Sequence, residues 1–368
     1  MLTLYPKLIL DALATVRYPG TGKNLVEAEM IADNIRIDGL TVSFSIIFEK
    51  DTDPFRKSVV KAAEAAIHAE ISPEVEVAIE VESRQASRPK PGKMLPGVKN
   101  VIAVSSGKGG VGKSTVAANL AVALAKLGYK VGLLDADIFG PSTPKMFQVE
   151  DAQPYAEMVD GRQLIMPIEK YGIKLLSIGF FVNPEQAILW RGGMASNALK
   201  QLIADANWGD IDYFVLDTPP GTSDIHLTLV QNLAITGAVI VSTPQQVALA
   251  DARKGINMYT NEQVDVPILG LVENMSWFTP ESHPDEKYYL FGREGVKQLA
   301  EEMDVELLGQ IPIVQGICES GDKGTPAALD NTTIMGRAFE ELARNVVKQN
   351  DIRNKTKAPT EIVEITQK

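Results

Sequence analysis

The sequence contains a single cysteine, Cys318, among 368 residues. One thiol excludes an internal disulfide, and it excludes a metal site built only from cysteines within one chain. A lone cysteine of this kind is more typical of a free structural side chain than of a ligand.

Long apolar runs and a surplus of basic residues are also missing. No window approaches the roughly 20 apolar residues that a membrane-spanning helix requires. The N-terminal stretch MLTLYPKLILDALATV has neither a basic start nor a small-residue cleavage site, which argues against a signal peptide. The formal net charge of −11 argues against a general nucleic-acid binder, because that function needs clustered Lys and Arg. We therefore expect a cytoplasmic protein with no membrane span and no nucleic-acid partner.

The composition is that of a soluble globular protein, with 45% hydrophobic and 23% charged residues, and the length allows two domains. Residues 1–84 predict a small α+β domain, because LTVSFSIIF alternates as a strand and helical spacing follows Asp53 and Pro54. Residues 85–98 are rich in proline and basic residues and predict a linker. Residues 351–368 predict a flexible tail.

Between residues 99 and 350, short apolar runs alternate with helical patterns. The runs are VIAVSS, KVGLLDA, IKLLSIG, DYFVLD, AVIVST, PILGLVEN and LLGQIPI. Near-continuous apolar strands separated by helices predict an α/β domain with a mostly parallel sheet covered on both faces. The last helix, near 332–350, carries Ile334, Phe339, Leu342 and Val346, but its polar face mixes both charge signs. That mixture favours packing on its own domain over a membrane anchor.

A complete phosphate-binding loop follows the first of these strands. It consists of Gly107, Lys108, Gly109, Gly110, Val111, Gly112, Lys113, Ser114 and Thr115, and it matches G-x-x-x-x-G-K-[ST] between a strand and a helix. The glycines allow successive N–H groups to converge on phosphate oxygens, and the helix N-terminus adds a favourable dipole. We expect Lys113 to reach the β- and γ-phosphates and Ser114 to help hold Mg²⁺. The loop therefore predicts an enzyme that binds ATP with Mg²⁺.

Three aspartates stand at the ends of predicted strands. Asp135 and Asp137 follow KVGLL, and Asp217 ends DYFVLD. Ligands of open α/β sheets sit at the carboxyl ends of the strands, so all three should face the phosphates. Asp217 is the candidate Mg²⁺ carboxylate, and Asp137 is the candidate for positioning the attacking water. A single strand-end aspartate is often only a helix cap, but three beside one phosphate loop favour a site.

The loop form KGGxGKS, followed by DxD and then DTPPGTSD, resembles the deviant-Walker ATPases, which include the nitrogenase iron protein, MinD, ParA and the arsenical-pump ATPase. Within that class, LLDADIFGPS, WRGGM, LDTPPGTSD and VENMSWF resemble the Mrp/ApbC family over about residues 99–345. The N-terminal unit is similar, more weakly, to the small iron–sulfur-assembly domain of many bacterial Mrp proteins. The resemblance implies a slow, homodimeric ATPase that handles a [4Fe–4S] cluster and serves apo iron–sulfur proteins or assembly factors.

The resemblance also implies roles for individual residues. Lys108 would reach across the dimer to the phosphates of the partner subunit, where an added cation stabilises charge in the transition state. Asn274 would read the adenine edge, and Asp135 and Thr218 would belong to segments that move on hydrolysis. Arg191 would face the dimer groove, a surface salt bridge being the alternative.

The chain departs from the family pattern at the cluster site. Pro280 and His283 stand where most carriers of this family have a C-x-x-C pair, and the cysteine of the small domain is missing around Asp51–Phe55. Proline cannot ligate iron, and a lone surface histidine is seldom a ligand. Two copies of Cys318 in a dimer would supply two of the four thiolates that a [4Fe–4S] cluster needs. No cluster ligands are therefore identified, and the cluster rests on resemblance alone.

Three functions stay open at this point. The first is an ATPase acting in iron–sulfur cluster assembly or transfer. The second is a positioning ATPase of the MinD or ParA kind, and the third is a nucleotide-switched scaffold that does not itself hold a cluster. A nitrogenase-type electron donor is excluded by the cysteine count.

Overall fold

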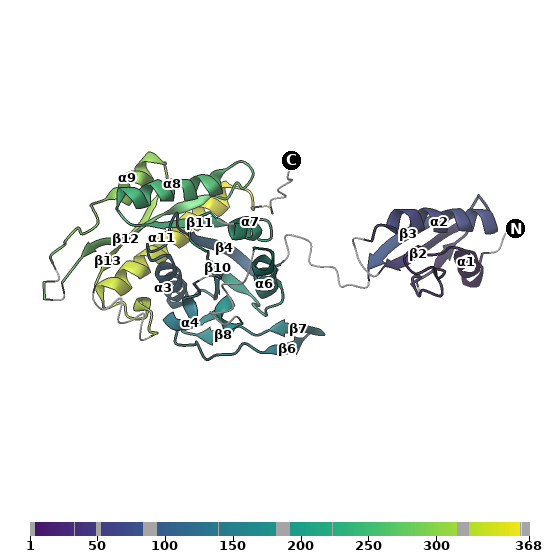
Figure 1. The fold of residues 1–368 in the computed structure, drawn as a ribbon, viewed down its shortest axis with the longest axis horizontal. Helices are drawn as coiled ribbons and strands as arrows, with labels where there is room; N and C mark the ends of the chain where they lie inside the picture. Colours follow the sequence, from purple (N-terminus) through teal and green to yellow (C-terminus); the bar gives the residue numbers. More distant parts are fainter. Residues whose placement is uncertain are drawn as a thin grey trace. The chain divides into compact units, whose positions relative to one another are not determined.

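The computed structural model describes residues 4–32, 34–48, 53–83, 94–138, 140–181, 192–222, 224–280, 282–283, 285–314, 324–360 and 362. The chain divides into two compact units, residues 1–90 and residues 91–368 (Figure 1). No helix within the described ranges is both long enough and apolar enough to cross a membrane.

The first unit is a three-stranded sheet with two helices. Its elements are α1 (Pro6–Leu13), β1 (Arg36–Asp38), β2 (Thr41–Phe48), α2 (Arg56–Glu70) and β3 (Glu76–Ser83). Strands β2 and β3 are parallel and joined by α2, whereas β1 pairs antiparallel with β2. The alternating side chains predicted to share one face of β2 are all at most 2% exposed: Val42, Phe44, Ile46 and Phe48. They pack with residues of both helices in one core, which explains the period-two pattern.

Helix α2 begins at Arg56, two residues after Pro54. Asp53 lies just before this start, and its Oδ1 accepts a hydrogen bond at 2.8 Å from the backbone N–H of Phe55, the N-cap residue. That bond forms a turn before the helix rather than its first turn.

The second unit is built on a mostly parallel sheet, as the sequence predicts. Its eight strands in the described part of the chain are β4 (Val98–Ser105), β5 (Val131–Asp135), β8 (Ile168–Lys170), β9 (Ile173–Ser177), β10 (Ile211–Asp217), β11 (Gly237–Ser242), β12 (Ile268–Phe278) and β13 (Leu307–Ile313). They lie in the order β13-β12-β11-β4-β10-β5-β9-β8, and only β8 runs antiparallel to its neighbour. A separate hairpin is formed by β6 (Ala156–Val159) and β7 (Arg162–Ile165).

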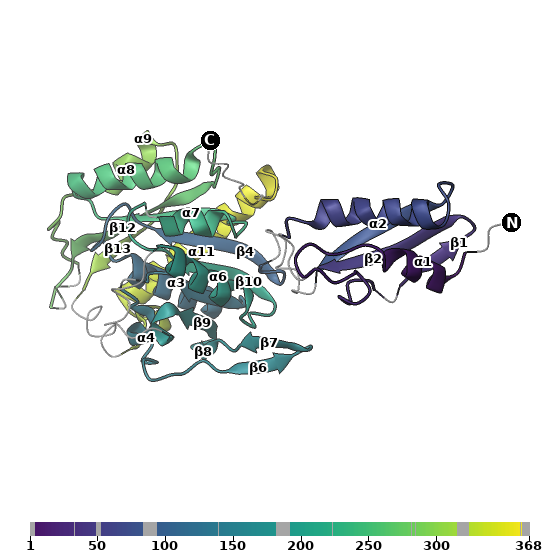
Figure 2. The same ribbon diagram turned by 45° about the vertical axis from the view of Figure 1, so that its right-hand side comes forward.

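Helices cover both faces of this sheet (Figure 2). They are α3 (Lys113–Lys126), α4 (Thr143–Met146), α6 (Gly192–Ala204), α7 (Asp224–Val230), α8 (Gln246–Thr260), α9 (Gly295–Glu302) and α11 (Ile334–Thr356), with the 3₁₀ turns η1 (Ile178–Phe180) and η2 (Ala327–Leu329). Alternate residues of β4 enter opposite cores: Ala103 belongs to the core that includes residues of α6, α7, α8 and α9, and Val104 belongs to the core that includes residues of α3 and α11. Burial on both faces explains why these strands read as continuous apolar runs.

The ends of the second unit differ from the predicted boundaries. Helix α11 continues to Thr356, past the predicted start of a flexible tail at residue 351. Arg353 holds this end, because it is 8% exposed and donates hydrogen bonds to the carbonyl oxygen of Ala358 and to the hydroxyl of Thr360. Met94 and Leu95, which the composition assigned to the linker, pack against the core of this unit.

The strand register brings three strand ends to one place. Asp217 of β10 pairs with Val104 of β4 on one side and with Asp135 of β5 on the other. The phosphate loop leaves β4 directly after this point, so both aspartates stand beside it.

Candidate nucleotide site

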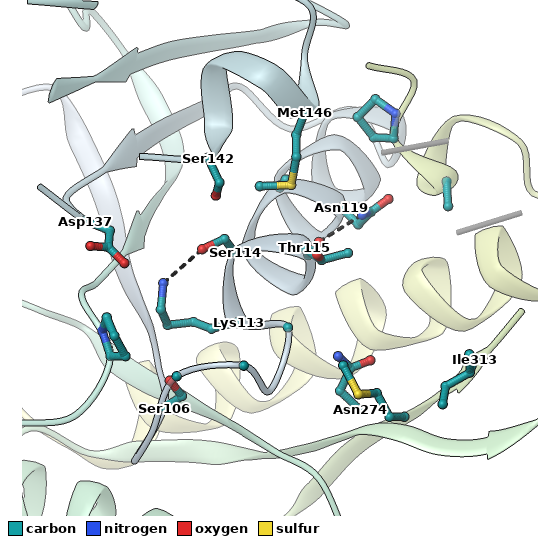
Figure 3. Close-up of a pocket in the computed structure, with 18 of the residues that line it drawn as sticks. Ser106, Lys113, Ser114, Thr115, Asn119, Asp137, Ser142, Met146, Asn274 and Ile313 are labelled. Atoms are coloured by element: carbon teal, nitrogen blue, oxygen red, sulfur yellow. Dashed lines mark hydrogen bonds between the residues drawn. The ribbon is translucent and has the colours of Figure 1, made fainter. Parts of the chain in front are cut away.

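A cleft of about 850 Å³ opens over the carboxyl ends of the central strands. The phosphate loop from Ser106 to Thr115 forms its floor, Asp137 and Ser142 lie on one side, and Asn274 and Ile313 lie on the other (Figure 3). Asp137 and Asn274, which stand 137 residues apart in the chain, thus contribute to one concave site. This is the position at which open α/β sheets bind ligands.

Two glycines give the loop its conformation. Gly110 and Gly112 have φ angles of 81° and 80°, in the left-handed region that favours glycine. A Cβ on Gly112 would stand 2.2 Å from Nδ2 of Asn274. The same Nδ2 donates a hydrogen bond to the carbonyl oxygen of Val111 at 2.8 Å, so β12 is fastened to the loop. Asn274 is 4% exposed and lines the cleft, beside the loop.

Gly107, the first glycine of the loop, lies close to the backbone of α8. A Cβ on Gly107 would stand 2.0 Å from the carbonyl oxygen of Asp251 and 2.5 Å from the backbone nitrogen of Ala252. Backbone atoms of a helix cannot move aside as a flexible side chain can. Only glycine therefore allows the loop to approach α8 this closely.

Lys113 and Asp217 form an ion pair at the base of the cleft. Lys113 is 6% exposed and Asp217 is fully buried. Lys113 Nζ also lies 3.1 Å from the hydroxyl of Ser114, so the three predicted residues meet. Burial raises the pKa of Asp217, and the charge of Lys113 opposes that rise. The arrangement concentrates one cation and one anion where water is excluded.

Asp217 also carries the atom that fits a metal ion. Its second oxygen, Oδ2, is buried and has no hydrogen-bond partner in the described part of the structure. Mg²⁺ prefers oxygen ligands, and it is commonly held by one or two carboxylates, a hydroxyl and substrate phosphates. The carboxylate of Asp217 and the hydroxyl of Ser114 therefore fit a magnesium ion bound with a nucleotide.

Asp135 fastens the segment that carries Asp137. Its Oδ1 accepts a hydrogen bond from the N–H of Asp137, and its Oδ2 accepts from the N–H of Thr143 and from the hydroxyl of Ser177, each at 3.1 Å. Burial and then the charge of Asp217 raise the pKa of Asp135 to about 7. Asp137 itself lines the cleft, and its Oδ1 accepts a bond from the N–H of Gly140 at 3.3 Å.

A buried polar group lies behind the loop, and of its side chains the sequence singles out only Thr218. Thr218 donates from its hydroxyl to the carbonyl oxygen of Val104 at 3.0 Å. Tyr259 of α8 hydrogen-bonds with Ser105 and Thr218, and burial raises its pKa to about 12. His226 Nε2 lies 3.5 Å from the hydroxyl of Ser105. These residues connect α7 and α8 to β4, the strand that precedes the loop. No local sequence pattern marks His226 and Tyr259, because their partners are distant in the chain.

Lys108 lines the same cleft as Lys113. Unlike Lys113, it has no ion-pair partner among the residues that the structure describes. Its backbone carbonyl accepts a hydrogen bond from the hydroxyl of Ser106 at 2.9 Å, which fixes the loop but leaves the side chain uncommitted.

The residues considered for a cluster are not gathered into a site. The side chain of His283 is 62% exposed, and its Nδ1 lies 3.8 Å from a carboxylate oxygen of Glu286. No three His, Cys, Asp or Glu side chains within the described ranges are arranged to hold a metal ion. Arg191, Cys318 and Asp51 lie outside the described residues.

Comparisons with known proteins agree with this geometry. A family model described as NUBPL iron-transfer P-loop NTPase matches residues 97–347, and a model described as iron-sulfur cluster assembly protein matches residues 7–81. An iron-sulfur cluster carrier protein of Synechocystis sp. is 42% identical over 340 residues, covering 92% of this chain and 96% of its own. One of Escherichia coli is 50% identical over 256 residues, covering 69% of this chain and 68% of its own.

Two solved structures are similar to the second unit. A nucleotide-binding protein of Archaeoglobus fulgidus in complex with ADP has a TM-score of 0.54 and 39% identity, covering 63% of this chain and 89% of its own. The septum site-determining protein MinD of Pyrococcus horikoshii, complexed with Mg-ADP, has a TM-score of 0.51 and 26% identity, covering 70% of this chain and 99% of its own.

Proposed function

The chain belongs to the NUBPL iron-transfer P-loop NTPase family, and from that membership we propose that it is a Mg-ATP-hydrolysing homodimer acting in iron–sulfur cluster assembly or transfer to apo-proteins. The observation that carries the proposal is the buried group of Lys113, Asp217 and Ser114 beneath the phosphate loop. A nucleotide bound on that loop meets a lysine for its phosphates and two oxygen ligands for Mg²⁺.

The protein side of the reaction divides among four groups. The loop amides and Lys113 bind the phosphates, and Asn274 lies beside the loop where the base is expected. Ser114 and Asp217 hold Mg²⁺, which when bound neutralises charge on the transferred phosphoryl group. Asp137, at the side of the cleft, orients the attacking water. Phosphoryl transfer needs positioning and charge stabilisation more than covalent chemistry, and these residues supply both.

The side chain of Lys108 is the reason for proposing a homodimer. It lies at the cleft without an ion-pair partner in the described part of the chain, so its charge is available to a neighbouring subunit. A second lysine approaching from the partner would act as an arginine finger does, adding a cation when charge develops in the transition state. Hydrolysis would then require two subunits to close around ATP.

The proposed role in iron–sulfur cluster assembly or transfer is supported by the relatives, and not by cluster ligands identified in this chain. Carrier proteins at 42% and 50% identity favour a role in iron–sulfur assembly. The described residues of this chain offer no ligand group for a cluster, and this observation favours a second candidate, a nucleotide-switched scaffold that holds no cluster itself. A membrane-positioning ATPase is disfavoured, because Phe339, Leu342 and Val346 of α11 are fully buried in their own domain.

Hydrolysis of ATP by the purified protein tests the catalytic part of the proposal. We expect slow, Mg²⁺-dependent release of phosphate, and we expect Lys113→Ala to remove it. Lys126→Ala is the matched control, because that lysine lies on the same helix but bonds to the carbonyl oxygens of Ala328 and Leu329. A Lys113→Ala variant that hydrolyses ATP at the wild-type rate would falsify the site.

A further inference from the structure

The hydroxyl of Ser142 makes no hydrogen bond with the residues that the structure describes. Its Oγ is one of five buried side-chain polar atoms without a hydrogen-bond partner in the described part of the chain, and Ser142 lines the nucleotide cleft. Buried polar atoms are nearly always paired, so an orphaned hydroxyl facing a cleft points to a ligand.

Helix capping, the usual role of such a serine, does not account for it. Ser142 precedes α4, yet its side chain makes no capping hydrogen bond. Thr333, in the equivalent position before α11, does cap its helix by accepting a bond from the N–H of Gly336 at 3.0 Å. The contrast shows that the Ser142 hydroxyl does not cap the helix that follows it.

The surrounding bonds hold Ser142 in place. Asp135 accepts hydrogen bonds from the N–H groups of Asp137 and Thr143, so both ends of the segment 137–143 are fastened to the end of β5. Ser142 therefore directly precedes an anchored residue, Thr143, beside the cleft.

Its position within the cleft indicates which part of a nucleotide it meets. In Figure 3, Ser142 and Asp137 lie on the side of Lys113 and Ser114, whereas Asn274 and Ile313 lie at the opposite end. The lysine of a phosphate loop contacts the β- and γ-phosphates, and the base lies at the other end. Ser142 is thus at the outer-phosphate end.

We propose that Ser142 is a γ-phosphate-sensing residue, whose hydroxyl donates a hydrogen bond to the terminal phosphate of ATP. This inference rests on the proposed function. ADP lacks that phosphate, so only ATP satisfies the buried hydroxyl. Residues 140–143 are then held more firmly with ATP than with ADP, and so is Asp137, whose carboxylate bonds to Gly140.

Nucleotide affinities test the proposal without relying on turnover. Dissociation constants for ADP and for the non-hydrolysable analogue AMPPNP, each with Mg²⁺, are measured for the wild type, Ser142→Ala and Ser196→Ala. Ser196 is the matched control. Its hydroxyl forms a hydrogen bond of 2.9 Å with the hydroxyl of Thr228, and Ser196 does not line the cleft. We expect Ser142→Ala to weaken AMPPNP about tenfold or more and ADP by less than about twofold, because a hydrogen bond to a charged group is lost only with AMPPNP.

Hydrogen exchange of the amides in residues 137–143 gives a second measurement. In the wild type, AMPPNP should protect these amides more than ADP does, and in Ser142→Ala the difference should disappear. An unchanged ratio of AMPPNP to ADP affinity in Ser142→Ala, with unchanged protection, overturns the inference and leaves the proposed function intact. A wild-type protein that binds neither nucleotide overturns the proposed function instead.

Discussion

Lys113 and Asp217 neutralise each other in a buried ion pair that joins the first residue of α3 to the last residue of β10. The pair serves the free protein as well as the proposed reaction. Two opposite charges can share a site that excludes water, but either one alone is strongly disfavoured there. The lysine of the phosphate loop therefore has a structural role that its motif does not reveal.

We predict that Lys113→Met lowers the free energy of unfolding of the nucleotide-free protein by about 3–5 kcal/mol, because it leaves Asp217 buried without its partner. Lys113→Met combined with Asp217→Asn should recover most of that loss, since no unpaired charge then remains. Thermal unfolding of both variants without nucleotide measures this, and ATP hydrolysis should be absent in both. A double variant as unstable as the single one would contradict the coupling.

The local sequence was sufficient to predict the loop and the seven parallel strands of the central sheet, but not the antiparallel edge strand β8. A phosphate loop is contiguous, and strands buried on both faces leave continuous apolar runs. The β6–β7 hairpin left no comparable pattern, because most of its residues are exposed and its strands are four residues long. Exposed strands lack the alternation that burial imposes.

Side-chain contacts between residues that are distant in the sequence could not be predicted either. Asp135 was expected at the phosphates, but its hydrogen bond to Ser177 depends on β5 and β9 lying side by side. The orphaned hydroxyl of Ser142 and the end of α11 at Arg353 depend likewise on neighbours that only the folded chain brings together.

Gly107 should be required for the fold of the loop itself. We predict that Gly107→Ala lowers the melting temperature of the nucleotide-free protein by several degrees, because its Cβ would overlap the backbone of α8 at Asp251. Gly109→Ala is the control, since the nearest atom to its Cβ would be 4.0 Å away on Pro220. Equal melting temperatures for the two variants would show that the loop does not depend on its contact with α8.

Lys108 predicts a specific complementation. Lys108→Ala and Lys113→Ala should each hydrolyse ATP poorly alone. In a mixed dimer, the Lys108→Ala subunit keeps an intact ATP site and receives Lys108 from its partner. An equal mixture should therefore recover about a quarter of the wild-type rate if subunits exchange freely between twofold dimers. No recovery, with mixed dimers demonstrated by differently tagged subunits, would mean that Lys108 acts on the ATP of its own subunit.

The last prediction concerns the cluster. After anaerobic reconstitution with iron and sulfide, we expect His283→Ala to retain as much iron as the wild type, because His283 is exposed and belongs to no group of three metal-ligating side chains among the described residues. Cys318→Ser is the informative comparison, since it removes the only thiolate in the chain. If Cys318→Ser lost the iron, the cluster would be held by two thiolates, one from each subunit of a dimer. Transfer to an apo-protein would then fail in that variant. A wild type that binds no iron but still hydrolyses ATP favours the scaffold, and iron lost in His283→Ala would contradict the prediction.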